Sequence, residues 1–438
     1  MFTLRGYERV STDDLMSLAT ERGSTPLQVG AVLMLDASES LEPGLVVDAL
    51  ANRVCAVPRL RQCLVDVPWG CGLPVWVDDR DFALSRHFSV IGCPAAGGES
   101  AVLGVAAEML GTRLPRDRPL WAAKLVTGTG GGGAALIVVF HHVLADGIGG
   151  LAVLAGLVDG APEAHDGVFP VRMPSRAQLA IQAASERMRA AGRLPAELAR
   201  LAGAASQLRP VFGRRLARSS LNRQTGPLRR FATVRVDLGQ IRRTAHSHEA
   251  TVNDIVLSTI AAALHRLLVV RGERVDEFVI SVPFSARRQA SARDLGNKSG
   301  VIPLHVPGVG DPGRRLESVA VATRAAKQAQ RGASTALLGP FFRLLAAAGL
   351  FRWFIDRQRL IHTFVSNLRG PESRLSFLGC PITNIIALSS ASGNVTVSFA
   401  VLSYAGSLTI TLIADPETCP DLSDLRDALE EEVRVLTA

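Results

Sequence analysis

The stretch that decides the fold runs from Ala134 to Gly150 and reads AALIVVFHHVLADGIGG. Its apolar start, AALIVVF, is the pattern of a short strand. If this strand continues into the histidines, the alternation of side chains places His141 and His142 on opposite faces. The two imidazoles are therefore poor joint ligands for one metal ion. We expect one of them to face a channel while the other packs inside.

The residues that end this strand carry reactive groups. A histidine at a strand end can act as a general base, because imidazole titrates near working pH. Asp146 can orient an imidazole, or it can pin the loop by pairing with an arginine, and Gly147 permits a tight bend and a close backbone approach. The alternative is a core histidine followed by a turn aspartate. The chain has no GxSxG nucleophile motif, which favours direct transfer over a covalent enzyme intermediate.

Composition narrows the class of protein. The chain has 438 residues, 47% hydrophobic and 20% charged, which indicates a globular protein of two or three domains. Its net charge is +8, and its basic residues are nearly all arginines, with only three lysines. This preference for arginine suggests a GC-rich genome rather than adaptation to an anionic binding partner. The first residues lack the apolar core of a signal peptide, so we expect no secretion by that route. The sequence has no run of 18 charge-free apolar residues, so it predicts no membrane-spanning helix. The six cysteines form no CxxC pair, so we expect reduced cytosolic thiols without a metal site.

Strand-like and helix-like segments alternate on both sides of an arginine-rich middle. This pattern predicts an α+β protein with an N-terminal domain over residues 1–185, a helical linker over 186–228 and a C-terminal domain over 229–438. The linker fits a solvated crossover or a surface that meets anionic lipid, and its near lack of aromatic residues argues against nucleic-acid binding. Glycines between two expected strands, at Gly128–Gly133, predict a hairpin turn and not a phosphate loop. The expected late strands are Ile382–Leu388, Val395–Ser403 and Leu408–Ala414.

The HHxxxDG pattern at residues 141–147 resembles the signature of the CoA-dependent acyltransferase superfamily, which includes chloramphenicol acetyltransferase and peptide-synthetase condensation domains. Further segments resemble, in order, motifs of the bacterial wax ester synthase/diacylglycerol acyltransferase family. They are STPLQVG at 24–30, Pro119-Leu120-Trp121, Asn253-Asp254, VPFSAR at 282–287, Gly296-Asn297 and SNLRGP at 366–371. Each short motif is weak alone, but the ordered set covers nearly the whole chain. One departure is Leu27-Gln28, where family members often carry Met-His.

This resemblance implies two chloramphenicol-acetyltransferase-like domains, with mixed sheets flanked by helices and an active-site tunnel between the domains. It implies that His142 is the catalytic base, with His141 as its neighbour, and that Asp146 and Gly147 shape the loop. Further site residues follow from the matching motifs. Asn253, Asp254, Ser366 and Asn367 would line the tunnel or bind CoA, Asn253 being alternatively a helix N-cap, while Pro119, Leu120 and Trp121 form a structural motif in which Trp121 packs in the core.

The implied activity is acyl transfer from long-chain acyl-CoA to diacylglycerol or to a long-chain alcohol, without a metal or any cofactor beyond the donor. Two alternatives stay open, namely a lipid-binding relative with weak or no catalysis and a condensation-type enzyme that takes acyl groups from a carrier protein. The segment Leu337–Leu360 is rich in aromatic residues and arginine, so it fits either a core helix or a helix on a membrane or lipid droplet. We therefore expect a cytoplasmic protein, with possible peripheral contact with such a surface.

Overall fold

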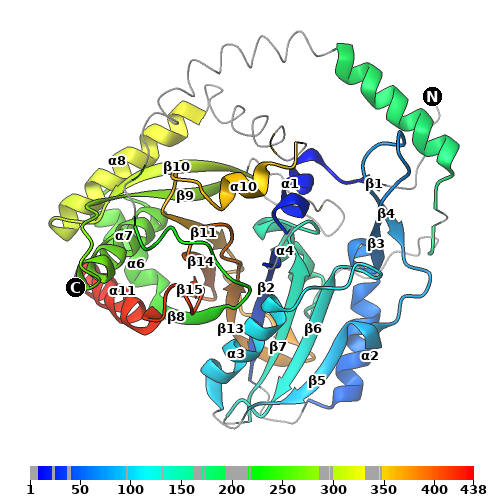
Figure 1. Ribbon diagram of the computed structural model, residues 1–438. Coiled ribbons are helices and arrows are strands. Elements are labelled where there is room, and N and C mark those ends of the chain that lie inside the picture. Colours follow the sequence, from blue (N-terminus) through cyan, green and yellow to red (C-terminus); the bar gives the residue numbers. More distant parts are fainter. Residues whose placement is uncertain are drawn as a thin grey trace.

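The computed structural model describes residues 8–21, 25–36, 41–94, 97–130, 132–161, 169–171, 173–192, 216, 219–285, 295, 299–330, 345 and 348–438. In these residues two six-stranded mixed sheets lie side by side, with a small three-stranded sheet at the edge of the first (Figure 1). Helices cover the outer side of each large sheet. The predicted α+β architecture is confirmed.

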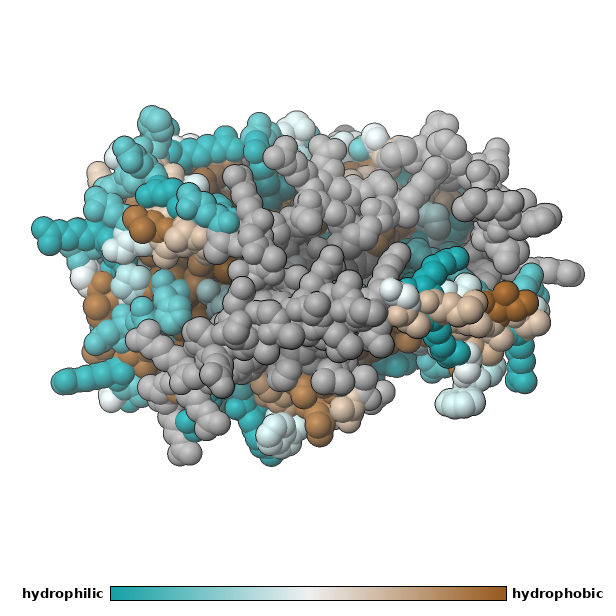
Figure 2. Space-filling model, turned by 90° about the horizontal axis from the view of Figure 1, so that it is seen from above, coloured by the Kyte–Doolittle hydropathy of each residue, from teal (hydrophilic) through white to brown (hydrophobic). Residues whose placement is uncertain are grey.

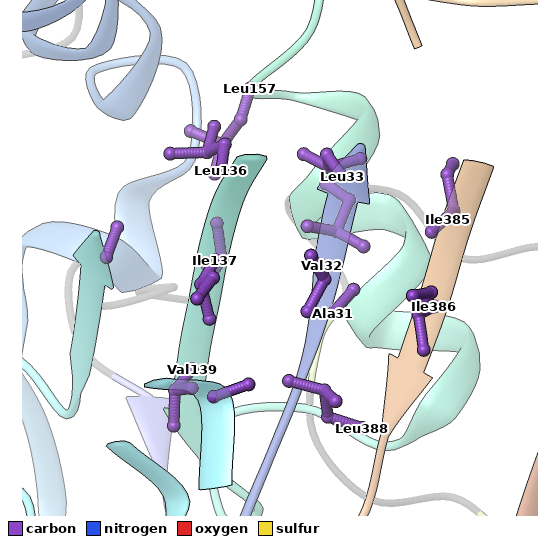
Figure 3. Close-up of a cluster of buried hydrophobic side chains, with 14 of the residues drawn as sticks. Ala31, Val32, Leu33, Leu136, Ile137, Val139, Leu157, Ile385, Ile386 and Leu388 are labelled. Carbon is purple, nitrogen blue, oxygen red and sulfur yellow. The ribbon is translucent and has the colours of Figure 1, made fainter. Parts of the chain in front are cut away.

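The first large sheet has the strand order β12-β13-β2-β7-β6-β5. Its central strand β7 is antiparallel to β2 and to β6 and is buried at every position, so its apolar sequence matches its place. Figure 3 shows the resulting core, in which side chains of β7, β2 and β13 meet. The strands are β2 (Gln28–Leu35), β5 (Phe88–Gly92), β6 (Trp121–Thr127), β7 (Ala134–His141), β12 (Ser376–Phe377) and β13 (Cys380–Leu388).

Short elements surround this sheet. The small sheet has the order β1-β4-β3 and was not predicted, since its strands are short and have mixed composition. The predicted hairpin at Gly128–Gly133 is confirmed, because β6 and β7 pair as its two arms. The other elements are β1 (Glu8–Arg9), α1 (Thr12–Thr20), α2 (Pro43–Val54), η1 (Pro58–Arg61), β3 (Gln62–Val65), β4 (Val75–Asp78), η2 (Leu84–Arg86), α3 (Gly98–Gly111), α4 (Gly147–Ala155) and a helix over residues 176–192.

The second large sheet has the order β10-β9-β11-β14-β15-β8, and helices α6, α7, α8 and α11 pack on its outer face. Helix α7 is long and apolar enough to cross a membrane by composition, but 72% of that window is buried inside the protein. It is the central helix of a core. The elements are β8 (Arg230–Asp237), α6 (Leu238–Ser247), α7 (Val252–Val270), β9 (Glu277–Ser285), β10 (Ser299–Pro307), α8 (Pro312–Gln330), α10 (Phe351–Ile355), β11 (Thr363–Arg369), β14 (Val397–Tyr404), β15 (Ser407–Ala414) and α11 (Leu422–Thr437).

The C-terminal part of the chain contributes the hairpin of β12 and β13 to the first sheet. Strand β13, expected in the second domain, pairs antiparallel with β2 and so completes the first sheet. Asp159 anchors the hairpin, since its carboxylate accepts the Ser376 hydroxyl at 2.7 Å and the backbone N–H groups of Leu378 and Gly379 at 2.9 Å. The range 229–438 therefore does not coincide with one sheet. Sequence periodicity predicts that a strand forms, but tertiary packing decides which strand it pairs with. The predicted linker 186–228 lies mostly outside the described residues.

Candidate active site

The two histidines stand at the end of β7, held by backbone contacts from two other motifs. The N–H of His141 donates to the carbonyl of Leu120 at 2.9 Å, and the N–H of His142 donates to the carbonyl of Leu27 at 3.0 Å. A turn follows, closed by the N–H of Leu144 on the carbonyl of His141 at 2.9 Å. The segments PLW and STPLQVG thus support the histidine turn on its two sides.

The environments of the two imidazoles differ, as the alternation argument predicts. His141 is 1% exposed, whereas His142 is only half-buried. The Nδ1 atom of His141 accepts the N–H of Val143 at 2.9 Å, and its Nε2 atom lies 3.2 Å from Oε2 of Glu21. Nδ1 of His141 is therefore hydrogen-bonded to the backbone, and Nε2 has a carboxylate oxygen as its close neighbour.

Glu21 is a site residue that the sequence analysis missed. It follows α1 and is 2% exposed, and Arg116 also donates to its carboxylate. Burial by itself raises the pKa of this carboxyl, but the hydrogen bonds and electrostatic attraction of His141 and Arg116 outweigh burial and lower the pKa to about 2. Glu21 is thus ionised at neutral pH. No local pattern distinguishes it from a solvated carboxylate at a helix end, because tertiary packing supplies its partners.

Asp146 and Gly147 shape the loop between the histidines and α4. The Oδ1 atom of Asp146 accepts the N–H of Gly149 at 2.9 Å, so this carboxylate is the N-cap of α4. Gly147 begins α4 and is not among the glycines with a positive φ, so the bend after the histidines does not depend on the left-handed conformation at this residue. The expected close approach is confirmed, since a Cβ at this position would lie 2.9 Å from Cδ2 of Leu368 on β11.

The second sheet brings two further motifs together. Nδ2 of Asn367 on β11 donates to Oδ1 of Asn253 in the first turn of α7 at 3.2 Å. The alternative role of Asn253 as the N-cap is wrong, because Thr251 caps α7 in a capping box with Asp254. Asp254 also accepts the hydroxyl of Thr323 at 2.6 Å, so its carboxylate holds α7 and α8.

Strand β11 loses one neighbour where the polar residues begin. It pairs with β9 only at Thr363 and Phe364, whereas it pairs with β14 from Val365 to Arg369. Among the described residues, Ser366 and Asn367 therefore have a strand partner on one side only. Leu368, the next residue, is the one that faces Gly147 across the two sheets. The HHxxxDG, SNLRGP and Asn253-Asp254 segments thus converge through Gly147, Leu368 and the Asn367–Asn253 bond.

Comparison with known proteins agrees with this geometry. The family model of the wax ester synthase/diacylglycerol acyltransferase catalytic domain matches residues 10–256. The model of the C-terminal domain of the same family matches residues 295–437. The chain belongs to the wax ester synthase/diacylglycerol acyltransferase family. It is therefore an acyltransferase of the diacylglycerol O-acyltransferase/wax ester synthase type that uses acyl-CoA and an acceptor.

Individual relatives cover nearly the whole acyltransferase. A putative diacylglycerol O-acyltransferase of Mycobacterium tuberculosis is 29% identical, over 98% of this chain and 90% of the relative. A solved wax ester synthase/diacylglycerol acyltransferase from Marinobacter aquaeolei shares 23% identity and a TM-score of 0.72, with 98% of each chain covered. A condensation domain of the calcium-dependent antibiotic synthetase shares the fold, with 20% identity and a TM-score of 0.65 over 98% of this chain and 96% of that one.

The PLW motif of this acyltransferase is structural, as expected. Trp121 is almost fully buried, and its Nε1 donates to the carbonyl of Leu60 at 2.8 Å. Its indole stacks on the imidazole of His87, with ring centroids 4.7 Å apart and an interplanar angle of 10°. Leu120 packs with Val143, directly under the histidine turn, and Pro119 is buried beside it. The PLW motif therefore supports the histidine turn by packing beneath it.

The departure at Gln28 also has a structural explanation. Gln28 is fully buried and lies opposite His141 in the β2–β7 register. Its Nε2 donates to the carbonyls of Leu110 at 2.7 Å and Thr112 at 2.8 Å, which caps the end of α3. The glutamine of this acyltransferase thus ties α3 to the strand beside the histidines. Within the described residues, no group of three His, Cys, Asp or Glu side chains could hold a metal ion.

Proposed function

We propose that this acyltransferase transfers a long-chain acyl group from acyl-CoA to the hydroxyl of diacylglycerol or of a long-chain alcohol, with His142 as the general base. One observation carries the choice of histidine. The ring of His141 is almost fully buried, bound at Nδ1 by Val143 and next to the Glu21 carboxylate at Nε2, whereas His142 is half-buried on the turn that precedes the contact with β11. The names of the mycobacterial relatives support diacylglycerol as an acceptor.

The reaction needs one proton to be moved twice. His142 takes the proton of the acceptor hydroxyl while that oxygen attacks the thioester carbonyl, which forms the new C–O bond and a tetrahedral oxyanion. Collapse of this intermediate breaks the C–S bond, and His142 returns the proton to the departing CoA thiolate. A positioned base contributes about 10²–10⁴-fold to such a reaction. The rest comes from orientation of the two substrates and from hydrogen-bond donors near the oxyanion.

Polar residues of the second sheet are the proposed donors. Ser366 and Asn367 lie where β11 has no β9 partner, and Asn253 meets Asn367 there. A hydroxyl and amide N–H groups at this point suit a thioester oxygen or the amides of the CoA arm. We propose that Asp254 contributes indirectly, since its carboxylate holds the first turn of α7 that carries Asn253. No metal and no cofactor beyond acyl-CoA enters these steps.

We propose that the protein acts in the cytoplasm, at the surface of a membrane or lipid droplet, where its acceptor resides. Residues 337–344, 346 and 347 lie outside the described residues, and in the described part of Leu337–Leu360 the side chains of Leu350 and Trp353 are exposed. Apolar side chains are also exposed on the helix over residues 176–192, at Ile181 and Met188, and Figure 2 shows apolar and hydrophilic residues side by side on that upper face. Exposed apolar side chains beside arginines suit an anionic lipid interface.

Flotation with vesicles of anionic phospholipid tests the surface contact. We expect the wild-type protein to float and a Trp353→Ala, Ile181→Ala, Met188→Ala variant to float less, with turnover of soluble short-chain substrates unchanged. A matched variant that changes exposed Val269 and Val270 to Ala on α7 controls for a general loss of apolar surface. Equal flotation of all three proteins would reject the surface contact.

A CoA-release assay with palmitoyl-CoA tests the reaction. Dioleoylglycerol and hexadecanol are offered separately to the wild type, to His142→Ala and to His246→Ala, which changes an exposed histidine of α6. We expect acceptor-dependent release that is lost only in His142→Ala. Release that does not depend on acceptor, or that is equal in the three proteins, would favour the lipid-binding alternative.

A further inference from the structure

The buried carboxylate beside the histidine turn has a role that its sequence position does not suggest. We propose that Glu21 is a positioning residue for acyl transfer, which fixes the tautomer of His141 so that His141 can hold the turn that carries His142. The inference rests on the proposed function of His142, but its geometry stands on its own. Three steps connect the Glu21 carboxylate to His142.

The first step is the choice of tautomer. Nδ1 of His141 accepts the backbone N–H of Val143 at 2.9 Å, and an acceptor nitrogen carries no proton. The proton of the imidazole is therefore on Nε2, the atom that lies 3.2 Å from Oε2 of Glu21. The carboxylate is the acceptor that makes this arrangement stable, because the ring and the carboxylate are both almost fully buried.

The second step is the hold on the turn. The ring of His141 binds the N–H of Val143, and the carbonyl of His141 accepts the N–H of Leu144. These two bonds enclose His142, which lies between the bonded residues. If the ring changed tautomer, Nδ1 would carry a proton and would face the Val143 N–H donor to donor. The backbone on both sides of His142 would then have to move.

The third step is the support of the carboxylate itself. Glu21 ends α1, its N–H donates to the carbonyl of Ser17 at 3.2 Å, and its own carbonyl accepts from Arg113 at 3.1 Å. Arg116 donates to the carboxylate from the solvent side. Glu21 is thus fixed at its backbone and at its side chain. A carboxylate fixed in this way can orient a buried imidazole, as an aspartate orients the histidine of a catalytic triad.

The kinetic test removes the acceptor and then restores it. In Glu21→Ala, His141 loses the acceptor of its Nε2 proton, and we expect kcat with palmitoyl-CoA and dioleoylglycerol to fall about 100-fold, since small displacements of a catalytic group cost that much. We expect KM to stay near the wild-type value, because Glu21 touches no substrate. In Glu21→Gln the amide oxygen can still accept the proton, so kcat should recover to within about fivefold of the wild type.

Two further measurements separate positioning from a purely structural contribution. In a double-mutant cycle, Glu21→Ala should add nothing to the loss of kcat in His141→Ala, because Glu21 acts through that ring. Selective ¹⁵N-histidine NMR, assigned with the His141→Gln variant, should show a protonated Nε2 for His141 in the wild type and in Glu21→Gln. In Glu21→Ala the same signals should report a mixture of tautomers.

A matched control is Asp415→Asn, which changes another buried carboxylate that accepts backbone N–H groups, at 2.6 Å from Gly226 and 2.9 Å from Glu417. We expect it to lower the melting temperature with kcat of the folded protein unchanged.

An unchanged kcat in Glu21→Ala, additive losses in the cycle, or a protonated Nδ1 in the wild type would each overturn the proposal. If Glu21→Ala does not fold, the wild-type tautomer and the kcat of Glu21→Gln still decide. If the wild type releases no CoA, the proposed function fails, whereas the NMR result tests Glu21 independently.

Discussion

Strands β7 and β11 each bring a polar segment to the site, but they do so in opposite ways. Strand β7 pairs with β2 along its whole length and with β6 from Ala134 to Phe140, and every one of its residues is buried. Strand β11 has β14 on one side, but it leaves β9 after Phe364. The histidines thus end a fully paired strand, whereas Ser366 and Asn367 lie on a strand that has lost a neighbour.

The difference separates two requirements of acyl transfer. A general base must be held within a fraction of an ångström, and a central strand of a packed core is the most rigid support available. Substrate groups must reach hydrogen-bond donors, and an unpaired strand side leaves polar atoms for them. We infer that the first sheet positions the base and that the second sheet admits and orients the substrates. Four sets of substitutions test how the two sheets build the site.

The largest effect is expected at the end of β7. His142→Ala removes the proposed base, so kcat should fall about 10²–10⁴-fold with little change in KM for palmitoyl-CoA. Ser366→Ala on β11 should instead raise KM for palmitoyl-CoA with a smaller change in kcat. Steady-state kinetics with dioleoylglycerol as acceptor measures both. A larger loss of kcat in Ser366→Ala than in His142→Ala would reverse the roles of the two sheets.

The contact between the sheets should be the next most sensitive place. Gly147→Ala puts a Cβ at 2.9 Å from Cδ2 of Leu368, and we expect a cost of about 1 kcal/mol of stability, at the low end for overpacking, because the half-buried Leu368 side chain can shift. Leu368→Ala in the same chain should restore part of the loss. Gly104→Ala, on α3 with open space around it, is the control and should be neutral or stabilising. Urea unfolding of the four proteins checks this, and a Gly147→Ala variant as stable as the wild type would refute the close packing.

A smaller effect is expected for the amide pair. Asn253→Ala and Asn367→Ala should each raise KM for palmitoyl-CoA about tenfold, and the double variant should lose less than the product, because the two side chains share one hydrogen bond. Asn222→Ala controls for loss of an amide elsewhere, since Asn222 binds the carbonyl of Ile361. Independent, multiplicative effects on KM would show that the pair does not act as a unit.

The smallest effect on activity is expected for Asp159→Asn, at the hairpin of β12 and β13. This change should nevertheless lower the stability of the protein clearly. Burial raises the pKa of its carboxyl, but hydrogen bonds from Ser376, Gly379, Arg53 and Leu378 outweigh burial and lower the pKa to about 2. A lowered pKa stabilises the fold above the ordinary value of 3.8, and the stabilisation is lost as the pH falls from there towards 2. The stability advantage of wild type over Asp159→Asn should therefore be full at pH 7 and smaller at pH 3. Urea midpoints at the two pH values measure it, and an advantage that does not shrink would contradict the lowered pKa.

Much of the fold and part of the site could be predicted from sequence. The apolar run before the histidines predicts β7, because strand alternation is a local property. The cap of α7 is local too, but the sequence suggests Asn253 as the candidate N-cap, whereas Thr251 caps the helix together with Asp254. The histidine pair is local too, so its division into a buried and a half-buried ring follows from alternation. Glu21 could not be found this way, since its partners His141 and Arg116 lie far along the chain.

The sequence by itself determined the main strands of the core, the family and the pair of histidines, because periodicity and ordered motifs are properties of neighbouring residues. Only the tertiary structure decided three further things: that β13 completes the first sheet, that Gly147 meets Leu368, and that Glu21 holds His141. Each of these is a choice of partner between distant segments. Such choices depend on which buried polar groups and apolar faces satisfy one another in the packed core, and no local pattern of residues records them.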